Sequence, residues 1–160
     1  MAPRTIYLIS IRFSKSQPQQ STSGSLINVI GAPMVGFADE YKRGCEPTKS
    51  IEPYEMWSIG GVDSVHIVDW PVGVGGVDTD PMGDLEIAAS QVPAPGISQD
   101  FIAPVNDITN RRCQEWTMEY VRHLVEKEYV GAEAIQIVQP KRDPPTHGIG
   151  LRRVVPQCGN

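Results

Sequence analysis

The feature that most constrains the fold is the segment of residues 110–129, NRRCQEWTMEYVRHLVEKEY, whose apolar residues keep helical spacing throughout. They recur at the intervals that place side chains on one stripe of an α-helix, namely Cys113, Trp116, Tyr120, Val121, Leu124 and Val125. Asn110 is expected to cap the first turn, and Gly131 lies just beyond the last turn. The sequence therefore predicts one long amphipathic helix with a buried stripe.

Strand-like segments lie before residue 69 and helical segments lie after residue 84. The expected strands are residues 5–13, 26–30, 51–59 and 65–68, with residues 37–42 as a strand or an irregular edge. Short helices are expected over residues 84–92 and 132–138, with a further helical turn within residues 97–102 and a loop over residues 69–82. We expect the first two strands to pair as an antiparallel hairpin with a long tip. This order predicts an α+β fold, in which an antiparallel sheet packs against the main helix and Cys113 lies at that helix's N-terminus.

The chain of 160 residues has the length of one domain. We expect residues 1–140 to form a single α+β domain. Within it, the Ser- and Gln-rich residues 14–25 form a mobile connector. Residues 141–160, which contain adjacent prolines, are expected to form an irregular C-terminal tail.

Charge and composition exclude several classes of function. The formal charge of −5 and a pI near 5.1, with no large basic patch, argue against a nucleic-acid partner. No apolar run approaches the roughly 18 residues of a membrane span, so a cytoplasmic protein is expected. The three cysteines are too widely spaced to indicate a zinc site or a disulfide framework. We expect no metal and no cofactor, and a small-molecule or peptide substrate as the partner.

Cys113 is the candidate for chemistry. It lies in the first turn of the predicted helix, where free N–H groups, the helix dipole and the neighbouring Arg111 and Arg112 favour a thiolate. A cysteine on an apolar helical stripe is also commonly a small buried hydrophobic residue, and this alternative stays open.

A nucleophilic cysteine needs a base within hydrogen-bond reach. His123 lies ten residues along the same helix, about 15 Å away along its axis, and is excluded. His147 lies in the Pro-rich tail, where a surface position is expected. His66, in a predicted strand, is the most plausible base, although an ordinary strand histidine is the more common case.

The segment N-R-R-C-Q-E-W, which opens an amphipathic helix after a series of strands, resembles the circularly permuted papain-like thiol families, such as the PPPDE peptidases and the lecithin:retinol acyltransferase-like proteins. The chain is also similar to a group of small uncharacterised fungal proteins through LINVIGAPMVGF, residues 84–93, APVNDITNRRCQEWTMEYVRHLVEK and KRDPPTHGIGLR. The first resemblance implies that Cys113 is the nucleophile. It also implies a histidine on an early strand, where this chain has only the connector.

Two functions follow as alternatives. The first is a papain-like cysteine hydrolase or acyltransferase that attacks an amide or ester through Cys113, with His66 as the base. The second is a non-catalytic papain-like binding domain that has lost its catalytic histidine. The groove candidates are Asn110, Arg112, Trp116 and Trp57, and Trp70 is a further wall candidate. For the tryptophans, packing in the core is the more common role.

Overall fold

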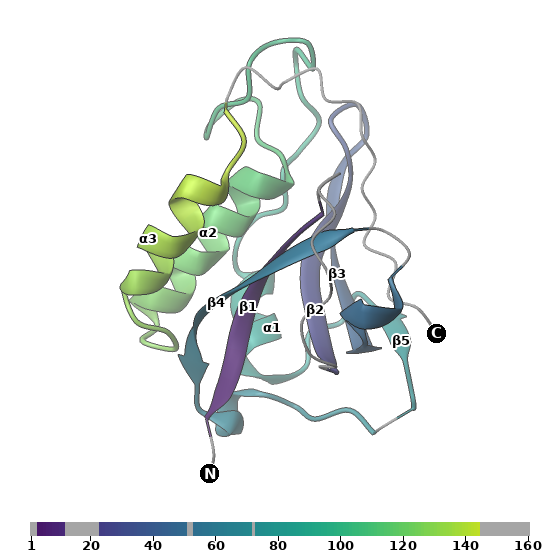
Figure 1. The fold of residues 1–160 in the computed structure, drawn as a ribbon. Coiled ribbons are helices and arrows are strands. Elements are labelled where there is room, and N and C mark those ends of the chain that lie inside the picture. Colours follow the sequence, from purple (N-terminus) through teal and green to yellow (C-terminus); the bar gives the residue numbers. More distant parts are fainter. Residues whose placement is uncertain (1–2, 12–22, 51–52, 72, 145–160) are drawn as a thin grey trace.

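The computed structural model describes residues 3–11, 23–50, 53–71 and 73–144 (Figure 1). Within them the strands are β1 (Arg4–Ile11), β2 (Gly24–Ala32), β3 (Gly36–Cys45), β4 (Tyr54–Val62) and β5 (Gly76–Asp78). The α-helices are α1 (Gly83–Ser90), α2 (Cys113–Glu126) and α3 (Glu133–Val138). Short 3-10 helices cover Pro47–Lys49, Ser64–His66 and Gln139–Lys141. The fold is α+β, as the order of elements predicts.

The strands form two small antiparallel sheets instead of the single sheet that was expected. One sheet contains β1 and β4, and the other has the order β2-β3-β5. The predicted pairing of the first two strands is wrong, because β2 pairs with β3 across the short turn of residues 33–35. The N–H of Val35 donates to Ala32 O over 3.0 Å, and Gly36 adopts φ +83°, a conformation that favours glycine. Closing this short turn costs less chain entropy than closing a hairpin through the long connector.

Three other predictions fail locally. Residues 65–68 were expected as a strand, but Ser64–His66 is a 3-10 helix, because the Asp63 carboxylate accepts from the N–H of Val65 over 3.1 Å. The expected loop of residues 69–82 contains β5. Residues 97–102 form turns without a helix. The connector of residues 14–25 lies mostly outside the described residues, and Gly24 already begins β2.

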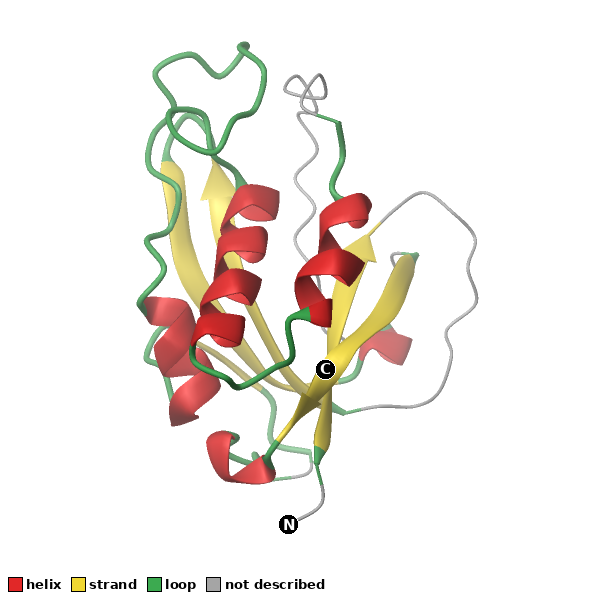
Figure 2. Cartoon of the chain, turned by 90° about the vertical axis from the view of Figure 1, so that its left-hand side faces the viewer, coloured by secondary structure: helices red, strands yellow, loops and turns green. Residues whose placement is uncertain are grey.

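Helix α2 lies at the centre of the core and contacts α1, α3 and β2. Figure 2 shows α2 and α3 beside each other over the strands. The middle of the predicted apolar stripe is buried, since Trp116 and Leu124 are each 1 % exposed, whereas Cys113 at its start is exposed and Val125 is half-buried. The Trp116 indole donates to Val92 O over 3.1 Å, and the Tyr120 hydroxyl donates to Leu85 O over 2.9 Å. Both aromatic side chains therefore bury their rings and satisfy their polar atoms.

A buried guanidinium joins β3, β5 and α1. Arg43, whose side chain is 4 % exposed, donates to Asp78 over 2.8 Å and to Glu86 over 2.7 Å. It also donates to the carbonyl oxygen of Asp80 over 2.8 Å. This network fixes α1 on the sheet that carries β2 and β3. Within the described parts of the chain, no helix has the length and apolar character needed to cross a membrane.

Candidate functional site

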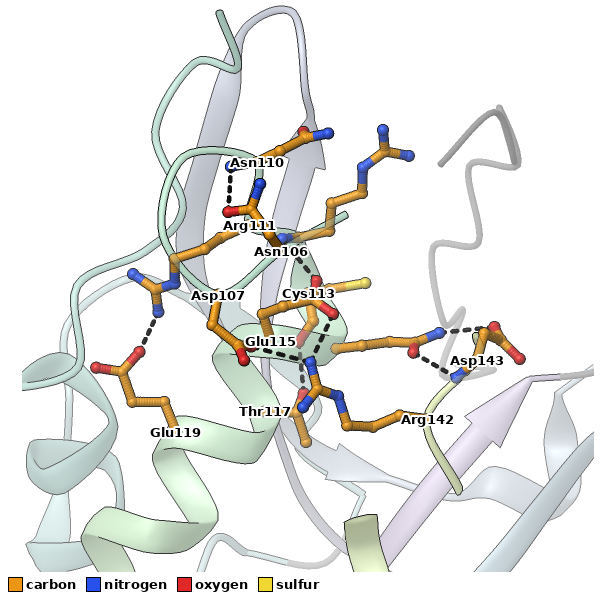
Figure 3. Close-up of polar contacts among 12 residues, drawn as sticks. Asn106, Asp107, Asn110, Arg111, Cys113, Glu115, Thr117, Glu119, Arg142 and Asp143 are labelled. Carbon is orange, nitrogen blue, oxygen red and sulfur yellow. Dashed lines mark hydrogen bonds and ion pairs between the residues drawn. The ribbon is translucent and has the colours of Figure 1, made fainter. Parts of the chain in front are cut away.

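The N-terminus of α2 differs from the expected cap. The helix begins at Cys113, and Arg112, not Asn110, is the N-cap. The Glu115 carboxylate accepts from the backbone N–H of Arg112 over 2.9 Å, and the Thr117 hydroxyl donates to Cys113 O over 2.8 Å (Figure 3). Glutamate at the third helical position thus caps the helix in place of an asparagine side chain.

The two neighbouring arginines do not pair with the thiol. Arg111 forms an ion pair with Glu119, and Arg112 donates to Phe101 O over 2.9 Å. In Figure 3 the sulfur of Cys113 points away from the Arg111–Glu119 pair. The positive charge that was expected to favour a thiolate is therefore directed elsewhere.

Burial by the surrounding protein, followed by the Glu115 carboxylate, raises the pKa of Cys113, and the N–H of Gln114 and the charge of Arg112 only partly offset the rise. Cys113 retains solvent-exposed surface, so water weakens the effect of burial, whereas the negative charge of Glu115 acts in the same direction. The contacts around Cys113 therefore give no support to the expectation that this thiol ionises more readily than a free cysteine.

The structure does not bring His66 to Cys113. The His66 ring lies 4.5 Å from the ring of Tyr129, beyond the C-terminal end of α2, and its Nδ1 lies 2.6 Å from a carboxylate oxygen of Asp84. Helix α2 has 14 residues and is therefore about 21 Å long, which places His66 and Cys113 at opposite ends. His123 hydrogen-bonds to Gln91 over 3.0 Å.

His147 lies outside the described residues. Among the histidines that the structure does describe, neither is placed to act as a base for Cys113. Cys45, which is 5 % exposed at the end of β3, is disulfide-bonded, a pairing that the wide spacing of the cysteines did not indicate. Cys113 is free.

The predicted groove residues separate into different environments. Trp116 is a core residue, and Trp57 on β4 is half-buried with the Lys141 ammonium 4.5 Å from its ring. Trp70 lies beside the guanidinium of Arg43, 5.2 Å away. Only Asn110 and Arg112 lie at the start of α2, where they support the preceding loop.

The loop that precedes α2 covers residues 91–112, and its buried residue Asn110 is 3 % exposed. Its amide nitrogen donates to Ala103 O over 2.6 Å and to Pro104 O over 3.1 Å, and its amide oxygen accepts from the Ser98 hydroxyl over 2.8 Å. Both arms of the loop are thereby bound to one buried side chain.

Asn106 closes the last turn of the loop. Its side-chain oxygen accepts from the backbone N–H groups of Ile108, Thr109 and Asn110 over 2.9, 2.7 and 3.2 Å. This is the turn chemistry for which asparagine is favoured, and it presents Ile108 outward. The sequence reasoning did not use this signal, which is visible as two asparagines four residues apart.

The loop also contacts the β2–β3 turn. The N–H of Ser98 donates to Pro33 O over 2.7 Å, and the N–H of Phe37 donates to Pro95 O over 2.9 Å. Two segments that are about 60 residues apart in the sequence therefore form one end of the molecule. Figure 1 shows this end above the N-terminus of α2.

Large apolar side chains are exposed at this end. We call them the apolar loop platform: Met34 (56 %), Val35 (71 %), Ile97 (68 %), Phe101 (40 %), Ile102 (63 %) and Ile108 (84 %). Single exposed apolar residues are ordinary, whereas large contiguous apolar patches are typical of interaction sites.

An open hollow of about 300 Å³ lies in the platform, and we call it the loop pocket. Its lining residues are Gly96, Ile97, Gln99, Ile108, Thr109 and Arg111. Two isoleucines form its apolar walls, and Arg111 is its one charged lining residue. Within the described residues, no group of His, Cys, Asp and Glu is arranged to hold a metal ion.

The described start of the predicted tail is held against α2. Arg142 donates to Glu115 and to Asp107, each over 3.0 Å, and Gln114 and Asp143 exchange two hydrogen bonds (Figure 3). Arg142 is therefore held by ion pairs and Asp143 by hydrogen bonds. No periodic pattern in the sequence indicated these contacts.

The fold and site together define a small α+β domain whose exposed apolar site is built from loops at the start of its main helix. Residues 2–131 match a family of unknown function, DUF6540, and the chain belongs to this family. No curated protein and no solved structure matches the chain. The resemblance to papain-like thiol families and the similarity to fungal proteins gain no support from these comparisons.

Proposed function

We propose that this chain is a non-catalytic binding domain, and that it docks a segment of another protein on the apolar loop platform. One observation carries the proposal. Six large apolar side chains, 40 % to 84 % exposed, lie on segments that are hydrogen-bonded to one another. Exposed apolar surface is costly in water, and burying it against a partner stabilises a complex.

Order in the loops supports a binding function. The loop before α2 is held by Asn110, which is 3 % exposed, and its turn is closed by Asn106. A loop that is already ordered loses little conformational entropy when it binds, so more of the contact energy appears as affinity.

A protein partner fits this surface better than a lipid surface. The chain carries a formal charge of −5, which opposes approach to an anionic membrane. The loop pocket combines Ile97 and Ile108 with Thr109, Gln99 and Arg111. Apolar residues beside polar groups that fix orientation are typical of protein and small-ligand sites.

A peptide-display selection tests this proposal. Wild-type protein is the target, and binders to an Ile102→Ser/Ile108→Ser variant are removed. The matched control is a Val65→Ser/Val77→Ser variant, because these valines are 66 % and 67 % exposed but lie outside the platform. Selected peptides should bind the wild type and the control equally and bind the platform variant weakly.

Peptides that bind all three proteins equally would contradict the proposal. So would binding to neutral phosphatidylcholine vesicles that disappears in the platform variant while no selected peptide depends on the platform.

A papain-like thiol hydrolase or acyltransferase acting through Cys113 is the second candidate. One observation favours it: Cys113 is a free, exposed thiol at the first residue of α2, open to an electrophile. The raised pKa of Cys113 and the distant His66 favour binding instead. An activity-based thiol probe tests it: labelling at pH 7 that exceeds the labelling of the denatured protein and vanishes in Cys113→Ser would support the enzyme.

A further inference from the structure

The loop pocket is lined by one cation, Arg111, which forms an ion pair with Glu119 but uses only part of its hydrogen-bond donors for it. Arg111 lines the pocket, and its side chain is 17 % exposed. Among the described residues, Glu119 is its one hydrogen-bond partner, reached through a single terminal nitrogen. A guanidinium has five N–H donors in a fixed fork, so donors remain for a second acceptor.

The walls beside this cation are apolar and open. Ile97 and Ile108 both line the pocket, and Ile108 is 84 % exposed. Apart from Gly96 itself and its two chain neighbours, no heavy atom lies within 4 Å of the position that a Cβ on Gly96 would occupy, so the backbone there is accessible to a ligand. The lining contains no carboxylate.

We infer that the loop pocket recognises the C-terminal carboxylate of a peptide whose last residue is aliphatic. This inference rests on the binding function proposed above and names the class of its ligand. A terminal residue carries its side chain and its carboxylate on the same Cα. One residue therefore places an aliphatic group between Ile97 and Ile108 while its carboxylate accepts from Arg111. An Asp or Glu side chain supplies the charge but no aliphatic group beside it.

Glu119 sets the strength of this interaction. It lies on α2, outside the pocket lining, and shares the guanidinium with the incoming carboxylate. Charge-assisted hydrogen bonds to a carboxylate are about twice as strong as neutral ones. Removing the charge of Glu119 leaves more of the guanidinium for the ligand, and removing Arg111 leaves no cation in the lining.

The test is titration of ¹⁵N-labelled protein with N-acetylated tetrapeptides that end in valine, leucine, alanine or lysine, each as the free acid and as the C-terminal amide. The leucine and valine acids should shift the amide signals of Ile108, Thr109 and Arg111. The amides should bind at least about tenfold more weakly, since they lack the charged acceptor. The alanine and lysine acids should bind more weakly than the leucine acid.

Two variants complete the test, each checked for an unchanged thermal midpoint. Arg111→Gln should lower the affinity for the leucine acid to that for the leucine amide, and Glu119→Gln should bind the acid at least as tightly as the wild type. Equal affinity for acid and amide would overturn the carboxylate inference and leave the platform function standing, provided the binding still depends on Ile108.

Other occupants give different results. Binding of isocaproate that equals binding of the leucine peptide would identify a small carboxylic acid, and not a peptide, as the ligand. Concentration-dependent dimerisation that disappears in Ile108→Ser would identify a second copy of this chain. Either result would overturn the inference, as would the absence of any shift with any peptide.

Discussion

The hydroxyl of Ser98 donates to the side-chain oxygen of Asn110 over 2.8 Å, and this bond joins the two arms of the loop that precedes α2. Asn110 thus has a different role from the helix cap that the sequence indicates. Its side chain lies behind the platform and determines where Ile97 and Ile108 are presented.

The first prediction concerns this loop. Asn110→Ala removes two donated hydrogen bonds and one accepted bond at a residue that is 3 % exposed. The orphaned carbonyls of Ala103 and Pro104 should cost about 1–3 kcal/mol of the free energy of unfolding. Urea denaturation measures this loss, and hydrogen exchange should rise over residues 98–110. Gln99→Ala, at an exposed position of the same loop, should change neither quantity.

The second prediction concerns Arg43 and Glu86. Arg43→Ala leaves the Glu86 carboxylate, whose side chain is 7 % exposed, without its cation and should cost roughly 3 kcal/mol. Arg43→Met/Glu86→Leu should restore part of that loss, because it removes both charges and fills the space. Thermal and urea unfolding of the three proteins provide the comparison. A double variant less stable than Arg43→Ala would contradict this prediction, and would show that the hydrogen bonds of the network stabilise the fold beyond the pairing of its charges.

The third prediction is a pH dependence. Hydrogen bonds from the backbone N–H groups of Asp80 and Thr79, with a further contribution from Arg43, lower the pKa of Asp78. A lowered pKa means that the contribution of Asp78 to stability is complete above the unfolded value of about 3.9 and is lost as pH falls through the folded value. The difference in stability between wild type and Asp78→Asn should therefore be constant above about pH 5, which is roughly one unit above the unfolded pKa. The difference should shrink as the pH falls further. A difference that grows with acidity would contradict this.

The fourth prediction concerns the thiols. Because the pKa of Cys113 is raised, its alkylation midpoint should lie at or above the free-cysteine value of about 8.5. Cys45 should resist alkylation until a reductant is added, since it is disulfide-bonded. Mass spectrometry of native protein over a pH series measures both. A Cys113 midpoint well below that of a free cysteine would contradict this prediction and would favour the thiol-enzyme alternative.

The redox state of Cys45 also bears on the cellular compartment of the protein. A cytoplasmic location was predicted from the composition, whereas disulfides persist mainly in oxidising compartments. A disulfide at Cys45 that survives isolation under thiol-blocking conditions would favour such a compartment.

Local patterns predicted much of the fold. The stripe through Trp116, Tyr120 and Leu124 identified α2, because helical periodicity depends only on residues close in sequence. Strand pairing is non-local, and the pairing of Leu8 with Trp57 in β1 and β4 left no signal in either segment. The short turn at Pro33, within the sequence GAPMVG of residues 31–36, was a local signal that the predicted strand pairing did not use.

The site was less predictable than the fold. Cys113 was correctly placed at the start of a helix, but its electrostatics depend on where Arg111 and Arg112 direct their guanidiniums, which tertiary contacts determine. Similarly, nothing in the sequence distinguishes Ile108 from other apolar residues. Its exposure follows from the turn that the hydrogen bonds accepted by Asn106 hold in place.

The most direct test of the central claim compares the affinity of one platform-binding peptide for four proteins: wild type, Ile108→Ser, Val77→Ser and Cys113→Ser. Calorimetric titration should show that Ile108→Ser binds at least about tenfold more weakly, since it loses the most exposed apolar side chain of the platform. Val77→Ser and Cys113→Ser should bind like the wild type, and the peptide should be recovered intact. Loss of binding in Cys113→Ser alone, or peptide cleavage that depends on Cys113, would contradict the account.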